Sequence, residues 1–461
     1  MKLILENIGK ISKADIQLDG ITVICGENNT GKSTIGKVLF SIYESLCDCD
    51  SVINQQRKKD IKDEYDKLHK DFIIICKDIS KSTNISIPLN WLDKYVNNLI
   101  KHDNDVQKII SNYCIDLFNL YNIPKNTTNS RITRWNHRAI TTLSDLCNIS
   151  DDEILCEIIS NKFNSIFYGQ LVKIQEDRQG ANIKLIHNNG ELKFSFNADN
   201  KCTDIQREFT IANDNVPIYI ENPLVIDYLG ETLLKSTEFF RDVLKPSVNY
   251  MDIYGKLFSN NIANTLTTSL MEIFSPYVKQ NANISAIKTE KKISDLIDTL
   301  NNLMKGKFIV DNSILKFKDN DILEPLDIRN LSTGMKSVGI LERCLNSQLI
   351  KEESILILDE PEIHLHPEWQ LKYAEFIVSL QNTLNLTVLI TTHSPQFLRA
   401  IECFTDKYET MDNLNVYSIT ENNIENVSYS EYGLSEIYDK LSKPYDTLQQ
   451  MLDQKYGDNY E

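Results

Sequence analysis

The arrangement of apolar and polar positions along this chain predicts an α/β fold. Three short runs are almost continuously apolar and rich in β-branched residues, as expected of strands buried on both faces: Ile21–Cys25, Ser354–Leu358 and Leu386–Ile390. Apolar residues recur at helical spacing over 35–42, after the first run, and over 369–380, after the second. Strands that alternate with helices in this way predict a sheet that carries helices on both faces.

The middle of the chain has a different pattern. Residues 182–187 and 192–196 alternate between apolar and polar positions on either side of Asn188-Asn189-Gly190, which predicts a β-hairpin and an antiparallel β layer. Residues 51–164 and 229–306 have a mostly helical pattern without a sustained heptad. We therefore expect helical insertions there and no long coiled coil.

A glycine-rich segment joins the first apolar strand to its helix. It reads Gly-x-x-x-x-Gly-Lys-Ser, and a strand before it and a helix after it are the setting of a phosphate-binding P-loop. The glycines let the backbone N–H groups turn toward phosphate oxygens, and the positive end of the helix favours the same anion. We expect Lys32 to bind the β- and γ-phosphates of ATP and Ser33 to hold Mg²⁺. The predicted nucleotide-binding residues here are Gly26, Asn28, Asn29, Thr30, Gly31, Lys32, Ser33 and Thr34.

Polar residues end the two later apolar strands. Asp359 and Glu360 close one of them, at the edge of the sheet where α/β proteins bind ligands. We expect Asp359 to hold Mg²⁺ through its water shell and Glu360 to orient the attacking water as general base. The alternative is an acidic pair that only caps a helix. His393 follows the next strand and is predicted to sense the γ-phosphate, although a lone histidine is often structural.

The segment Leu331-Ser332-Thr333-Gly334 precedes a further helical pattern. Ser332 is expected to cap this helix, so that its hydroxyl and the free N–H groups of the first turn face outward. Such an anion site has no phosphate of its own in the same subunit. The segment resembles the signature of ABC-type ATPases, which closes over ATP held by a second copy. The resemblance implies that Ser332 and Gly334 contact that ATP in a homodimer or a higher homo-oligomer.

Taken in order, these four segments resemble the SMC/RecF-like branch of ABC ATPases. More narrowly, Asp359-Glu360-Pro361-Glu362-Ile363-His364-Leu365-His366-Pro367 resembles the standalone ATPases of the overcoming-lysogenisation (OLD) class in prokaryotic antiviral systems. The resemblance implies an ABC-type P-loop head, with a mixed sheet, helices on both faces, an antiparallel β layer and helical insertions. It also implies ATP and Mg²⁺ as cofactors. Lys10 lies where relatives carry a basic residue, so by resemblance it lies beside the nucleotide. No Q-loop glutamine is evident after residues 217–220.

The resemblance also implies a role. The sequence after His393 is too short for the TOPRIM nuclease domain of full OLD proteins, so a separate effector, a nuclease or toxin-like chain, is expected, as in the PtuA and AriA type. This favours an ATP-driven switch of an antiviral system. The alternatives are a RecF-like DNA-repair ATPase that clamps duplex DNA and, less favoured because of the long interruption after the P-loop, the motor subunit of a transporter.

Charge and composition restrict the partners. The net charge of −16 disfavours broad nucleic-acid binding. Arg131, Arg134 and Arg138 around Trp135 permit phosphate contact and stacking, but a basic helix face of this kind is more often only solvated or salt-bridged. Residues 401–461 are acidic and tyrosine-rich, which suits protein docking or packing on the chain's own head. The 10 cysteines form no C-x-x-C pair and no apolar stretch is long enough for a membrane span, so a cytoplasmic protein is expected.

These patterns divide the chain into six expected segments. Three belong to the ATPase head, two are helical insertions and one is an acidic tail. The head segments are 1–50 with the P-loop, 165–228 with the β layer and 307–400 with the signature, acidic strand and histidine; the insertions are 51–164 and 229–306; the tail is 401–461.

Overall fold

The structure is a computed structural model. The residues that it describes are 1–79, 91–101, 106–123, 129–174, 179–188, 190–211, 217–224, 226, 284–311, 314–346, 349–420, 423–427 and 434–456. The chain forms two compact units: the first contains Met1–Cys47 and Ser160–Glu461, and the second contains Asp48–Ile159.

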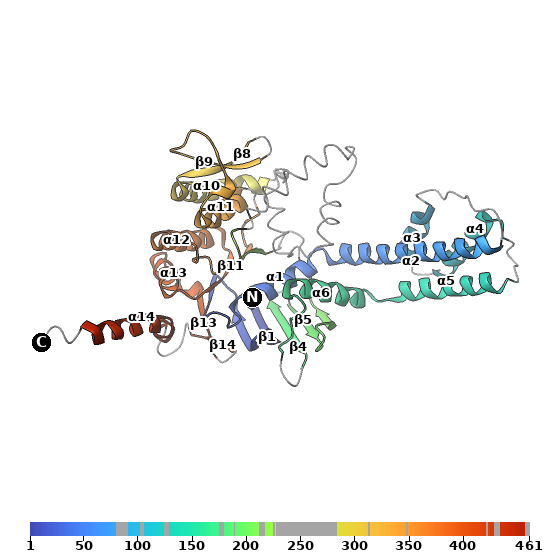
Figure 1. Ribbon diagram of the computed structural model, residues 1–461, viewed down its shortest axis with the longest axis horizontal. Helices are drawn as coiled ribbons and strands as arrows, with labels where there is room; N and C mark the ends of the chain where they lie inside the picture. Colours follow the sequence, from blue (N-terminus) through green and yellow to red (C-terminus); the bar gives the residue numbers. More distant parts are fainter. Residues whose placement is uncertain are drawn as a thin grey trace. The chain divides into compact units, whose positions relative to one another are not determined.

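The first unit is built on an 11-stranded mixed sheet, shown in Figure 1. The strand order is β6-β5-β4-β1-β2-β14-β13-β3-β12-β11-β7. The bounds of these strands are β1 Lys2–Ile8, β2 Ile11–Gln17, β3 Ile21–Cys25, β4 Ala181–His187, β5 Gly190–Phe196, β6 Cys202–Arg207, β7 Ile218–Ile220, β11 Ile355–Asp359, β12 Thr387–Thr392, β13 Leu414–Thr420 and β14 Asn423–Asn426.

The sheet has a parallel part and an antiparallel part. Strands β13, β3, β12, β11 and β7 are parallel neighbours, while β2, β1, β4, β5 and β6 are antiparallel neighbours. β14 joins the two parts, because it pairs antiparallel with β13 and parallel with β2. The predicted hairpin is present as β4 and β5, with His187 opposite Gly190. The sheet therefore has the α/β arrangement with an antiparallel β layer that the sequence predicts.

Register brings the carboxyl ends of the central strands together. Asp359 lies opposite Thr391, and Thr392 lies opposite Cys25. The residues that follow β3, β11 and β12 therefore lie at one edge of the sheet, which is where ligands bind in open α/β sheets.

Helices cover both faces of the parallel strands. On one face α1 approaches so closely that a side chain at Gly36 would contact Ile357 and Tyr219. On the other face the apolar core is completed by helices that contribute, among others, Leu300, Leu341 and Ile377. The helices of this unit are α1 Lys32–Leu46, α10 Ile284–Met304, α11 Thr333–Asn346, α12 Pro367–Leu384, α13 Pro395–Lys407 and α14 Ser435–Tyr456, with 3₁₀ turns at Ile328–Asn330 and Met411–Asn413.

A small antiparallel sheet precedes the helix α11. Its strands are β8 Gly306–Asp311, β9 Ile314–Asp319 and β10 Leu326–Asp327, in the order β10-β9-β8. The contact between Phe308 of β8 and Gly339 of α11 is close, since an added Cβ at Gly339 would lie 2.2 Å from the phenyl ring.

The second unit is helical. Its helices are α2 Cys49–Ile79, α3 Trp91–Lys101, α4 Val106–Leu120 and α5 Ser130–Asn148, and α6 Asp151–Phe167 begins in it and continues into the first unit. The core is rich in aromatic side chains, including Tyr65, Phe72, Tyr113 and Trp135.

The helices and strands lie as follows relative to the six segments expected from the sequence. Helices α2 to α6 lie almost wholly within residues 51–164, and of 229–306 only residues from 284 onward are described. Strands β13 and β14, however, belong to the main sheet although they lie in the expected tail, 401–461. Within the described ranges, no helix combines the length and the apolar character that a membrane crossing needs. The segment boundaries themselves stay predictions.

Candidate functional site

The P-loop wraps at the end of β3 and leads into α1. Gly31, which caps the helix, has φ of 102°, a backbone conformation that side chains disfavour. A Cβ at Gly31 would also lie 3.3 Å from Ile11. Thr30 stabilises the loop by donating a hydrogen bond to the Glu27 carbonyl over 2.8 Å. The second glycine of the motif is thus required by backbone geometry.

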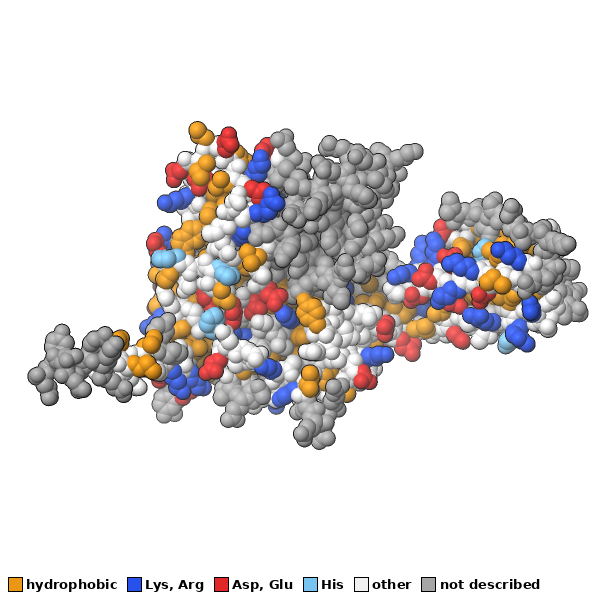
Figure 2. All heavy atoms as spheres, viewed as in Figure 1, with side chains coloured by type: hydrophobic (Ala, Val, Ile, Leu, Met, Phe, Trp, Pro, Cys, Tyr) orange, Lys and Arg blue, Asp and Glu red, His pale blue; other side chains and the backbone are white. Residues whose placement is uncertain are grey.

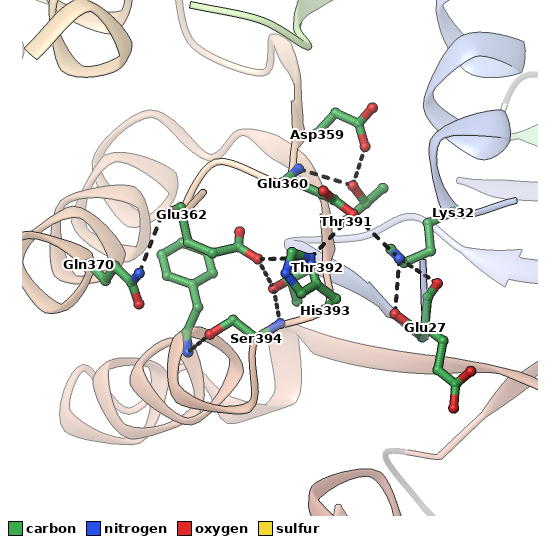
Figure 3. Close-up of polar contacts among 12 residues, drawn as sticks. Glu27, Lys32, Asp359, Glu360, Glu362, Gln370, Thr391, Thr392, His393 and Ser394 are labelled. Atoms are coloured by element: carbon green, nitrogen blue, oxygen red, sulfur yellow. Dashed lines mark hydrogen bonds and ion pairs between the residues drawn. The ribbon is translucent and has the colours of Figure 1, made fainter. Parts of the chain in front are cut away.

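Lys32 is buried within this loop. Its side chain is only 4% exposed, and its Nζ donates hydrogen bonds to the carbonyls of Gly26, at 2.9 Å, and Glu27, at 2.7 Å. The same ammonium lies 3.4 Å from Glu360 Oε1 (Figure 3). A lysine held in this way is placed to exchange these oxygens for phosphate oxygens.

The turn between β1 and β2 lies against the P-loop. Lys10 Nζ donates a hydrogen bond to the Asn29 carbonyl over 2.8 Å. A Cβ at Gly9 would lie 3.4 Å from Thr34 Oγ1, so the turn and the start of α1 are in contact. Lys10 therefore lies beside the P-loop, as its sequence position suggests, and its contact with nucleotide stays a prediction.

Asp359 is the centre of a hydroxyl cluster at the end of β11. Ser33 Oγ donates to its Oδ1 over 2.9 Å, and Tyr219 donates to its Oδ2 over 3.1 Å. Thr391 Oγ1 also donates to Oδ1. Burial, together with the nearby carboxylate of Asp359, raises the pKa of Tyr219 well above its ordinary value, so this phenol stays a neutral donor.

The backbone leaves the sheet at Glu360, immediately after Asp359. Its φ is 48°, and its N–H donates to the Thr391 carbonyl over 3.0 Å, which fixes this unusual backbone. Its Oε1 lies 3.4 Å from His393 Nδ1 and 3.4 Å from Lys32 Nζ. The predicted base, sensor and phosphate-binding lysine are therefore within reach of one another.

Glu360 and His393 line an open hollow of about 420 Å³. The residues around it are Asn28, Glu360, Glu362, Ile363, Gln370, His393 and Ser394. Residues of the P-loop, of the acidic strand and of the segment after β12 thus meet at one site. No residue of the signature segment is among them.

The signature segment caps α11 as expected. Ser332 is exposed, and its Oγ accepts a hydrogen bond from Met335 N over 3.3 Å. Gly334 is needed for a close approach, because a Cβ there would lie 2.8 Å from the His364 carbonyl oxygen. In the part of the chain that the structure describes, no hydrogen bond joins Ser332 to the P-loop.

The sequence did not reveal several residues that support the site. Tyr219, Thr391 and Thr392 are buried side chains whose hydroxyl groups hold Asp359 and Glu362 in place. Glu362 is 2% exposed, and burial is the main cause that raises its pKa. A buried threonine pair at the end of an apolar strand was the available signal for these contacts.

The tryptophan of the arginine patch is buried. Trp135 is 3% exposed and donates its Nε1–H to the Leu68 carbonyl over 2.9 Å, so its ring cannot stack on a base. Arg131 and Arg134 are exposed on α5, and Arg138 lies 3.1 Å from Asp71. The structure therefore agrees with the alternative of a solvated and salt-bridged basic face, because the helical spacing that separates the arginines turns the tryptophan into the core of its unit.

Comparison with known proteins agrees with this architecture. The chain matches the model of the AAA ATPase domain over residues 1–398. The chain belongs to this family. It is an ATPase and binds nucleotide, and the motif residues of the site lie within the matched range, 1–398.

Several solved structures are similar to this ATPase at low sequence identity. An SMC head bound to the C-winged helix domain of ScpA is 11% identical, with 92% of this chain and 96% of that chain covered and a TM-score of 0.35. The SMC head domain from Thermotoga maritima is 12% identical, with 93% and 97% covered and a TM-score of 0.34. The recombination mediator protein RecF is 11% identical, with 92% and 97% covered and a TM-score of 0.33. The fold assignment rests on the sheet topology and on the family match.

Proposed function

We propose that this ATPase works as a dimeric switch, in which ATP closes two copies of the head and hydrolysis releases them. Lys32 binds the β- and γ-phosphates, Glu360 orients the attacking water, and His393 donates a hydrogen bond to the γ-phosphate. Ser332 and Gly334 of one copy complete the site of the other. The observation that carries this proposal is the hollow itself, which has P-loop, acidic-strand and histidine residues but no signature residue.

We infer that Ser33 and Asp359 hold Mg²⁺ at this site. Both offer oxygen atoms, and their contact at 2.9 Å places them on one side of the P-loop. Among the residues that the structure describes, no group of three or more His, Cys, Asp or Glu side chains could hold a metal ion. Two oxygen ligands from the protein suffice for Mg²⁺, which keeps several waters and takes substrate phosphates as ligands. When bound, Mg²⁺ neutralises charge on the phosphates.

We further propose that head closure controls a separate effector protein of an antiviral system. The resemblance of residues 359–367 to the OLD class supports this role. So does helix α14, which carries exposed apolar side chains at Leu448, Met451 and Leu452 on an acidic segment. Exposed apolar side chains grouped on one helix suit a protein partner better than nucleic acid.

The second candidate is a RecF-like ATPase that clamps duplex DNA. The exposed arginines Arg131 and Arg134 of α5 favour it, because arginine contacts phosphate well. Two observations count against it. Acidic side chains lie among the basic ones on the face of the second unit that Figure 2 draws, and Trp135 is buried. A DNA clamp of this kind would lose affinity steeply as salt increases.

The dimer is tested by measuring the molar mass of Glu360→Gln with and without ATP. We expect a monomer without ATP and a dimer with ATP, because the variant binds ATP but hydrolyses it slowly. Adding Ser332→Arg should keep ATP binding and abolish dimerisation, whereas adding Lys32→Ala should abolish both. Hydrolysis at the wild-type rate by Ser332→Arg would show that the site is complete within one copy.

The output is tested by purifying tagged Glu360→Gln with ATP and nuclease, followed by mass spectrometry. A stoichiometric nuclease or toxin-like chain whose release follows ATP hydrolysis supports the switch. A protein that returns alone but protects DNA, which salt then releases, supports the clamp instead.

A further inference from the structure

Glu362 is a buried carboxyl group that the hydrolytic scheme above leaves without a role. Its side chain is 3% exposed, and its Oε1 accepts a hydrogen bond from Thr392 Oγ1 over 2.5 Å. Its Oε2 is buried and has no hydrogen-bond partner. An unpaired buried carboxyl oxygen costs folding free energy, so it calls for a partner that arrives in another state of the protein.

His393, close to Glu362, also has a buried ring nitrogen without a hydrogen-bond partner. Its Nδ1 has no hydrogen bond, although it lies 3.9 Å from Glu362 Oε1 and 3.4 Å from Glu360 Oε1. Dashed lines in Figure 3 join the imidazole to both carboxyl groups. His393 and Glu362 both line the hollow. Small movements would therefore let Nδ1 pair with either acid.

We propose that Glu362 is a positioning residue that pairs with Nδ1 of His393 when nucleotide occupies the site, and so presents Nε2–H to the γ-phosphate. This inference rests on the proposed function, in which His393 contacts that phosphate. Distances such as 3.9 Å commonly shorten when a substrate completes an active site.

The pairing keeps a proton on Nε2 of His393, whether Glu362 or Nδ1 carries the second proton that lies between them. A protonated Glu362 donates its O–H to Nδ1 of a neutral imidazole, whose single proton is then on Nε2. An ionised Glu362 accepts from Nδ1–H of an imidazolium, which also carries a proton on Nε2. Burial raises the pKa of Glu362, which favours the first arrangement.

The same pairing releases the catalytic glutamate. In the described structure Glu360 Oε1 faces both His393 and Lys32 at 3.4 Å. Phosphate oxygens attract Lys32, and Glu362 attracts His393, so Glu360 is left to accept a hydrogen bond from water. Thr392 keeps Glu362 in place for this, since its hydroxyl is itself oriented by Ser394 N–H at 3.0 Å.

The test is a double-mutant cycle with Glu362→Ala and His393→Ala, read as kcat and as the Kd for ATP. We expect Glu362→Ala to lower kcat by about ten- to a hundredfold, as loss of an orienting partner does elsewhere, with an unchanged Kd. The double variant should be no slower than His393→Ala alone, because Glu362 acts only through His393. Glu342→Gln, at another buried glutamate, should leave kcat unchanged.

Glu362→Gln separates positioning from proton transfer. Its amide N–H can donate to Nδ1, and its carbonyl can accept from Thr392, so we expect most of the activity to return. Activity as low as that of the alanine variant would overturn the inference, and so would full additivity in the cycle. If the alanine variant does not fold, Glu362→Met takes its place because it fills a similar volume. Wild-type hydrolysis by His393→Ala would overturn this inference and the proposed role of His393 together, whereas a slow His393→Ala beside a normal Glu362→Ala would overturn this inference alone.

Discussion

Two buried glutamates show how much local surroundings decide the behaviour of the same side chain. Glu342 on α11 is 2% exposed and accepts a hydrogen bond from Asn346 Nδ2 over 2.6 Å, while its Oε2 has no hydrogen-bond partner. Burial raises the pKa of Glu342 to about 7, against 4.5 for an ordinary glutamate. Glu362 is equally buried but lies beside His393 at the nucleotide site. Only one of the two is therefore expected to affect hydrolysis.

Glu342 makes folding stability depend on pH. Between about pH 4.5 and pH 7 the folded chain holds a proton there that the unfolded chain releases, so the free energy of unfolding falls as pH rises. The full loss, reached well above pH 7, is on the order of 3 kcal/mol. Glu342→Gln does not lose this stability. The difference between its unfolding temperature and that of wild type should therefore shift in favour of the variant from pH 5 to pH 8. Thermal unfolding at both pH values measures this, with the exposed Glu436→Gln as control; equal pH dependence in Glu342→Gln and wild type would contradict it.

At the residue scale, the sequence predicted the parts of the site that are local and not those that come from distant segments. Lys32, Asp359 and Glu360 follow directly from the residues around them. Tyr219 and Thr391 hold Asp359 only because β7 and β12 flank β11 in the sheet. Strand order is a property of the whole fold, so such partners cannot be identified from short patterns.

At the scale of elements, the P-loop depends on how closely α1 approaches the sheet. A Cβ at Gly36 would lie 2.8 Å from Ile357 Cγ2 and 3.3 Å from the ring of Tyr219. Tyr219 in turn donates a hydrogen bond to Asp359. One small residue on α1 therefore sets the distance between the phosphate-binding helix and the acidic strand.

Gly36→Ala should destabilise the protein by about 1–3 kcal/mol, because it overpacks a filled interface. It should also weaken ATP binding, since α1 begins at Lys32. Chemical denaturation and ATP titration measure the two effects. Ile357→Ala removes the methyl group that the new Cβ meets, so the double variant should regain ATP affinity. A Gly36→Ala variant as stable as wild type would show that α1 can move away freely.

At the scale of the whole molecule, the head depends on strands near residue 420. β13 and β14 join the parallel strands to the antiparallel layer, and they lie in the segment 401–461, which was expected as an acidic, tyrosine-rich segment that docks a protein or packs on the head. A short signal was present, because the apolar residues Leu414 and Val416 lie on either side of the polar Asn415. The acidic, tyrosine-rich composition of the segment outweighed it. The amino-acid composition of a segment indicates how polar its surface is, whereas the spacing of its apolar residues indicates whether it forms a strand.

Shortened chains test this dependence. A chain that ends after residue 409 lacks β13 and β14, so its sheet is divided and two strand edges are exposed; we expect it to aggregate and not to bind ATP. A chain that ends after Ser442 keeps Tyr438, which donates a hydrogen bond to Glu402, and loses a part of α14 in which Leu448, Met451 and Leu452 are exposed. It should unfold at the wild-type temperature. Solubility, thermal unfolding and ATP titration compare the two, and a soluble, ATP-binding chain ending at 409 would contradict the expectation.

The position of β3 in the sheet also governs how the protein is made on the ribosome. β3 is complete at Cys25, yet both of its neighbours, β12 and β13, come from residues 387 and beyond. Until residues 387 and beyond are made, the nascent chain therefore carries an apolar strand with no partner, which is a substrate for chaperones and a risk for aggregation. Such long-range pairing also slows folding, because a long loop must close before any contact is gained. ATP cannot assist the early steps, since the pocket that binds it is assembled from segments that are synthesised far apart in time.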